Sequence, residues 1–205
     1  MKRILLSAMT AALVAAAILG IWTTQPQIGV IEAKSEFIRW DIVSVAPPVD
    51  FDIDPGGIST ARDLAGNPIT ITGSGTFVAP RGGRSNAVTG GGTWDTGSDS
   101  GTYEVTSLVS WVEGNGSVVG SPLNDNIGNP EDSRAGLAVL TVEFDDGTEG
   151  VLTVSCKLPT TPPGDMAIVF EGIIVTKDYV SYWNPDQPAG GVDANRTIFH
   201  VVDHP

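Results

Sequence analysis

The sequence contains little cysteine and little positive charge. Its single cysteine, Cys156, excludes an internal disulfide bond and any metal site built from four cysteines. Only 11 residues are Lys or Arg, against 24 Asp or Glu, so the formal net charge is −13. Because proteins bind phosphate backbones through clustered Lys and Arg side chains, we expect no nucleic-acid partner.

Charged residues are also scarce overall. They make up 17% of the chain, below the usual value of about a quarter, whereas 41% of the residues are apolar. A disordered acidic tail would show the reverse. After residue 33 no segment has a helical period, which excludes a coiled coil and a bundle of long helices. The 25 glycines and 14 prolines instead favour a protein of strands and turns.

The N-terminal segment has the pattern of an export signal. Lys2 and Arg3 precede an apolar run from Ile4 to Trp22, and a cut after Ala33 would release the rest of the chain. The run is also long enough to span a bilayer. Residues 1–33 are therefore expected to be a signal peptide or an uncleaved N-terminal membrane anchor. Either way, the protein is expected to be secreted or extracytoplasmic and to touch a membrane only through this segment.

The rest of the chain, residues 34–205, is predicted to be a single all-β domain. Apolar and polar side chains alternate with a period of two, which places them on opposite faces of a strand. Asp146 and Gly147 lie between two such segments and predict a hairpin, because that turn needs positive φ. The predicted strands are 38–42, 69–77, 103–111, 138–144, 152–158, 167–176, 180–183 and 197–202.

About eight strands, each with one apolar face, must bury those faces by closing into a barrel or by packing as two sheets. Glycines inside the predicted strands suit the tight bends of a small barrel. We therefore expect a single antiparallel barrel of about eight strands, with a β-sandwich as the alternative.

Four short segments carry a resemblance to other proteins. They are GSGTF at 73–77, GGGTW at 90–94, GTY at 101–103 and ANRTIFH at 194–200. With these segments the chain resembles a group of uncharacterised exported bacterial β-barrel proteins. In shape alone it is similar to the barrels of allene oxide cyclase and dirigent proteins. No catalytic position of those families can be matched, so the resemblance implies a fold and no activity.

Three carboxylates at alternate positions, Asp50, Asp52 and Asp54, are candidate metal ligands. Such oxygen ligands suit Ca²⁺. The calcium-loop pattern then fails, since Pro55 and Ala61 stand where an EF-hand has Gly and Glu. We favour an acidic, solvated strand edge and expect no cofactor, with Ca²⁺ as the alternative.

Glu171 is the best candidate for acid–base chemistry. It lies in the apolar run 167–175, where burial would raise the pKa of its carboxyl group. His200, Asp178 or Arg134 could serve as its partner. The alternative, which we favour, is that Glu171 faces solvent while its apolar neighbours face the core.

Four aromatic side chains, those of Trp40, Phe77, Tyr103 and Trp111, are expected on inward faces. They could line a pocket for an apolar or sugar ligand, or simply fill the core.

The sequence contains no nucleophile elbow, no P-loop and no dinucleotide fingerprint. The first hypothesis is therefore a non-catalytic exported barrel that binds a small molecule or the cell surface. One alternative is a cofactor-free isomerase or cyclase that uses a buried carboxylate. Another is a structural or adhesive surface module.

Overall fold

The computed structural model describes residues 35–45, 51–79, 85–164, 169–188 and 193–203. Residues 1–33, the predicted signal or anchor, lie outside these ranges. No helix in the described part of the chain has the length and apolar character needed to cross a membrane. The elements of this part, in chain order, are β1 (Glu36–Val45), β2 (Asp52–Pro55), β3 (Ser59–Arg62), β4 (Pro68–Ile71), β5 (Ser74–Ala79), β6 (Val88–Asp95), β7 (Ser100–Gly114), β8 (Asn124–Asp125), the 3₁₀ turn η1 (Pro130–Asp132), β9 (Ser133–Phe144), β10 (Glu149–Cys156), β11 (Gly172–Lys177), β12 (Val180–Tyr182), β13 (Asn184–Pro185) and β14 (Arg196–Val202).

Six antiparallel strands close into a barrel. Around the ring, β1 pairs with β5, β5 with β6, β6 with β7, β7 with β9, β9 with β14, and β14 with β1. The predicted all-β barrel is therefore confirmed. The predicted number of about eight strands is wrong, because only six belong to the closed ring.

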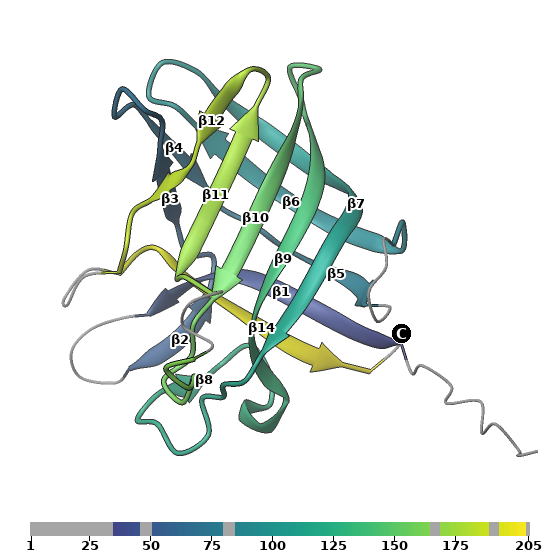
Figure 1. Ribbon diagram of the computed structural model, residues 1–205, viewed down its shortest axis with the longest axis vertical. Coiled ribbons are helices and arrows are strands. Elements are labelled where there is room, and N and C mark those ends of the chain that lie inside the picture. The colour runs from purple at the N-terminus through teal and green to yellow at the C-terminus, as the bar shows by residue number, and fades with distance from the viewer. Residues whose placement is uncertain (1–34, 46–50, 80–84, 165–168, 189–192, 204–205) are drawn as a thin grey trace, which may run out of the picture. The chain divides into compact units, whose positions relative to one another are not determined.

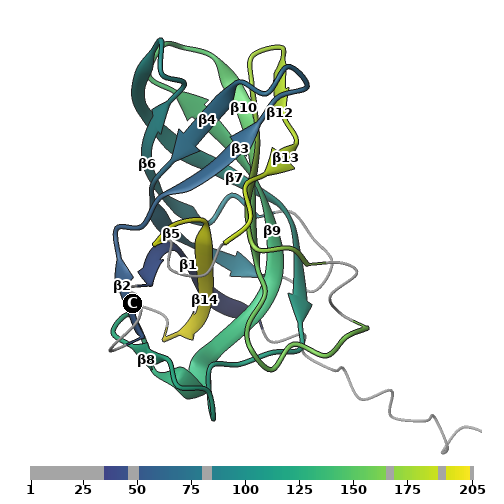
Figure 2. The same ribbon diagram turned by 90° about the vertical axis from the view of Figure 1, so that its left-hand side faces the viewer.

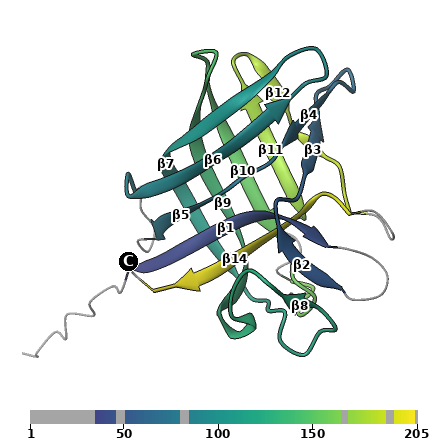
Figure 3. The same cartoon turned by 180° about the vertical axis from the view of Figure 1, so that it is seen from behind.

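The remaining strands extend the ring outward. β10, β11 and β12 continue the sheet from β9, while β4, β3 and β13 continue it from β6. Figures 1 and 3 show these two extensions at the end of the barrel opposite to β2 and β8. β2 pairs with the end of β1, and β8 pairs with β2 in parallel.

The chain bends sharply between β4 and β5. The prediction of one strand over 69–77 is wrong here, because Gly73, at φ +145°, separates the two strands. The Tyr103 hydroxyl donates a 2.9 Å hydrogen bond to the carbonyl of Thr72, and a Cβ on Gly73 would lie 2.5 Å from that hydroxyl. A glycine is required at this bend by both backbone angle and space.

The GSGTF and GGGTW segments lie side by side in the ring, on the paired strands β5 and β6. Gly75 of β5 pairs directly with Gly90 of β6. A Cβ on Gly75 would lie 2.2 Å from the carbonyl oxygen of Thr89 and 2.8 Å from the Cα of Gly90. The two strands thus approach at a point where neither has room for a side chain, which allows a strong local bend.

The hairpin predicted around Asp146 and Gly147 is confirmed. It joins β9 to β10, with Glu143 opposite Glu149. The amide of Phe144 donates to the carbonyl of Thr148 at 2.8 Å, and Gly147 has the positive φ, +82°, that the turn needs.

Aromatic rings fill the inside of the barrel. Trp111 packs against Phe199 with ring centroids 4.7 Å apart and against Phe77 at 5.4 Å. Trp40 is fully buried on the same inner face of β1 and β14. Ring packing of this kind stabilises the fold beyond the area it buries.

The outer face of β1 and β14 is also covered. Figure 2 shows β2 and β8 next to β1 and β14. Apolar side chains from these segments join the buried core or pack against it, and we name five of them the outer core: Val43, Ile53, Leu123, Ile127 and Ile198. β1 therefore buries residues on both of its faces.

Candidate functional site

A pocket of about 370 Å³ opens at one end of the outer core. We call it the outer pocket. Its walls come from β1, β2 and β14 and from the segments that follow β10 and β13. Its lining residues are Val43, Val45, Ile53, Leu123, Lys157, Leu158, Pro159, Glu171, Gln187, Pro188, Arg196, Thr197 and Ile198. Most of these side chains are apolar, and the charged groups are Lys157, Glu171 and Arg196.

Glu171 forms one side of the outer pocket. Strand β11 starts only at Gly172, which has a φ of +109°, so Glu171 does not follow the alternation of a strand. Its two carboxylate oxygens each accept a 2.7 Å hydrogen bond from a backbone amide, one from Lys157 after β10 and one from Thr197 in β14. The side chain therefore joins two strands while lining a pocket.

The environment of Glu171 favours its neutral form. Burial raises the pKa of Glu171 to about 8, against the opposing effects of the two backbone amides and the charge of Arg196. Burial thus shifts the equilibrium of Glu171 toward its protonated form.

Arg196 lies at the start of β14, opposite Val43 of β1. Its Nε atom is buried and has no hydrogen-bond partner among the described residues. Because the oxygens of Glu171 face backbone amides, Arg196 acts on that carboxyl through its charge. A buried donor without an acceptor is costly and calls for an explanation.

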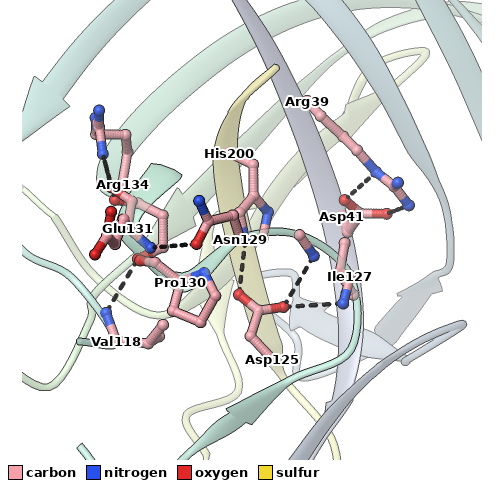
Figure 4. Close-up of polar contacts among 12 residues, drawn as sticks. Arg39, Asp41, Val118, Asp125, Ile127, Asn129, Pro130, Glu131, Arg134 and His200 are labelled. Atoms are coloured by element: carbon pink, nitrogen blue, oxygen red, sulfur yellow. Dashed lines mark hydrogen bonds and ion pairs between the residues drawn. The ribbon is translucent and has the colours of Figure 1, made fainter. Parts of the chain in front are cut away.

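A second polar group lies farther along the outer face of β1 and β14. We call Arg39, Asp41, Asp125 and His200 the polar cluster (Figure 4). The guanidinium of Arg39 forms two hydrogen bonds with Asp41, of 2.7 and 2.8 Å. Nε2 of His200 lies 2.7 Å from Oδ2 of Asp125, and both side chains are almost completely buried.

The polar cluster is held in place by further contacts. Oδ1 of Asp125 accepts hydrogen bonds from the amides of Ile127 and Gly128, at 2.9 and 3.2 Å. Burial opposes ionisation of Asp125, but these hydrogen bonds and the one with His200 outweigh it and lower the pKa of Asp125. Burial raises the pKa of Asp41, although Arg39 works in the other direction. These contacts link β8 and the following loop to β14.

The structure does not assemble a catalytic triad around His200. Its Nδ1 atom is buried and has no hydrogen-bond partner among the described residues, so no hydroxyl is positioned there as a nucleophile. The sequence did not single out Asp125 as the partner of His200, because 75 residues separate them.

Glu171 and His200, the predicted acid–base candidates, line different pockets. Glu171 lines the outer pocket, and His200 lines one of about 270 Å³ together with Gly128 and Asp203. Arg134, a suggested partner, pairs with Glu113 at 3.3 Å. Sequence reasoning did not single out Arg196, because only the fold shows that it lines the outer pocket together with Lys157 and Glu171.

The predicted ligand residues occupy the barrel interior. Trp40, Phe77 and Trp111 lie in the aromatic core, and Phe77 and Trp111 are in ring contact. Tyr103 packs against Phe144, with ring centroids 6.1 Å apart. None of these four residues lines the outer pocket.

The acidic edge of β2 is hydrogen-bonded to β8. Asn124 donates to Asp52 at 2.8 Å, and Asn126 donates to Asp54 at 2.9 Å. Asp50 lies outside the described residues, so the predicted calcium trio stays a prediction. Within the described ranges, no group of three or more His, Cys, Asp or Glu residues is arranged to hold a metal ion.

Comparisons with known proteins found no matching family model, no matching curated protein and no matching solved structure. Functional inference therefore rests on the geometry of the sites themselves.

Proposed function

We propose that the chain is an exported, non-catalytic barrel protein that binds a small molecule with a mainly apolar body in the outer pocket. The observation that carries this proposal is the pocket itself, which combines a volume of about 370 Å³ with apolar walls and a few charged groups. Ligand sites in proteins have this size and this composition. The positively charged residues and the apolar run at the N-terminus support an extracytoplasmic location.

The contacts of Glu171 favour binding over catalysis. Both of its oxygens already accept backbone hydrogen bonds, so they hold β10 and β14 together. A residue with this role is fixed by the fold, whereas a general base needs an oxygen directed at its substrate.

Calorimetric titration tests the proposal with four probes: octanoate, octan-1-ol, octyl glucoside and methyl glucoside, each below its micelle-forming concentration. We expect octyl probes to bind and methyl glucoside not to bind. The variant Val45→Trp fills the pocket and should abolish binding, whereas Val112→Trp, at an exposed site, should not. The proposal fails if no octyl probe binds or if Val45→Trp binds as the parent protein does.

A second function, a cofactor-free isomerase or cyclase, is favoured by one observation: the pKa of about 8 that burial gives Glu171 in a pocket with apolar walls. A ¹³C-NMR titration of the Glu171 carboxyl tests it. A pKa near the ordinary value of 4.5 would remove this candidate.

A further inference from the structure

The charge of the outer pocket differs from that of the whole molecule. The protein has a net charge of −13, yet the pocket is lined by two cationic side chains, Lys157 and Arg196, and one carboxyl group. Both oxygens of that carboxyl, on Glu171, accept hydrogen bonds from backbone amides at 2.7 Å. Arg196 thus presents a positive charge to the pocket, while the neighbouring Glu171 carboxyl forms its hydrogen bonds with backbone amides.

The guanidinium of Arg196 also contains a donor that is still available. Its Nε atom is buried and has no partner among the described residues. Elsewhere on the chain, Arg39 and Arg62 each form paired hydrogen bonds with an aspartate, Asp41 and Asp186. Arg196 therefore differs from these arginines: it lines a cavity, and its buried Nε donor has no acceptor among the described residues.

The walls around this donor are apolar. Val43 lies directly opposite Arg196 in the β1–β14 pair, and Ile53, Leu123 and Leu158 complete the surface. A ligand that satisfies both features has an anionic, planar head group and an apolar body. Carboxylates match the guanidinium fork in shape and charge.

We propose that the outer pocket binds amphipathic monocarboxylates, with the carboxylate on Arg196 and the apolar part against the outer core. This inference rests on the proposed function and specifies its ligand class. Lys157, an exposed residue directly after β10, adds a second positive charge to the pocket lining.

The test compares octanoate, octan-1-ol and octylamine by calorimetric titration at neutral pH and low salt. The parent protein should bind octanoate on the order of ten times more tightly than octan-1-ol, the ratio that one charge-assisted hydrogen bond supplies. Arg196→Gln should reduce the affinity for octanoate to that for octan-1-ol. The affinity for octan-1-ol should stay unchanged, which also shows that the pocket of the variant is folded.

Arg62→Gln is the matched control, because Arg62 pairs with Asp186 and does not line the pocket. It should leave both affinities unchanged. Equal binding of octanoate and octan-1-ol, insensitivity of octanoate binding to Arg196→Gln, or preference for octylamine would overturn the ligand class while leaving the pocket function intact. Failure of all three probes would overturn both proposals.

Discussion

Individual side chains between the outer face of β1 and β14 and the segments that cover it decide how those segments are attached. Asp125 is the clearest case, because its carboxylate binds His200 and two backbone amides from a buried position. Removing a buried acceptor that binds this many donors costs more stability than removing an exposed one, because the buried donors are left unsatisfied.

Asp125→Asn should therefore lower the free energy of unfolding by about 1–3 kcal/mol, because the amide replaces a charged acceptor and leaves donors unsatisfied. Urea denaturation measures this loss. Asp52→Asn is the control, since Asp52 lies on the solvated edge of β2 and accepts a bond from Asn124. Equal effects of the two substitutions would contradict the structural role of the polar cluster.

Glu171 should make stability depend on pH. Its pKa is about 8 in the folded protein and 4.5 in an ordinary environment, so the folded state binds the proton more tightly. The stabilisation is complete below pH 4.5 and is lost as the pH rises to about 8. The parent protein should therefore lose stability over this range relative to Glu171→Gln, which has no proton to release. Parallel stability curves for the two proteins would show that burial does not raise this pKa.

Strands β5 and β6 depend on glycine for their close approach. Gly75→Ala would place a methyl group 2.2 Å from the carbonyl oxygen of Thr89. We expect a loss of about 1–3 kcal/mol or more in unfolding free energy, because the backbone cannot move without opening the ring. Gly164→Ala is the control, since a Cβ there meets nothing within 4 Å. A Gly75→Ala protein as stable as the control would contradict the β5–β6 pairing.

The strands could be predicted from the sequence where apolar and polar residues alternate regularly. The prediction failed where the backbone departs from that alternation. The β9–β10 hairpin follows directly from Asp146 and Gly147. In β7 a strict alternation would place Val109 on the same inward face as Val105, but the structure buries Leu108 instead. The strand shifts its register twice, between Val105 and Ser107 and between Leu108 and Ser110, and each bulge reverses the faces.

Both faces of β1 are used, and sequence alone could not show this. Arg39 and Asp41 alternate with apolar residues, which predicts one wetted face. The structure buries Asp41 and satisfies it with Arg39, because β2 and β8 cover that face. A buried ion pair has the same sequence pattern as two exposed charges. The outer core and the outer pocket therefore could not be predicted from the sequence.

The described part of the chain forms a closed barrel filled with aromatic side chains. The outer core is a separate apolar layer outside this barrel. From the sequence, Trp40, Phe77, Tyr103 and Trp111 could either line a ligand pocket or fill the core. In the structure Phe77 and Trp111 pack against one another, and the outer pocket lies on the other face of β1 and β14. We therefore propose that a small ligand binds outside the barrel, in the outer pocket.

Amide chemical-shift mapping of the ¹⁵N-labelled protein during titration with octanoate tests this claim most directly. The shifted resonances should cluster at Lys157, Leu158, Thr197 and Ile198, which line the outer pocket. Shifts centred on the side-chain indoles of Trp40 and Trp111, with the outer pocket unchanged, would contradict it.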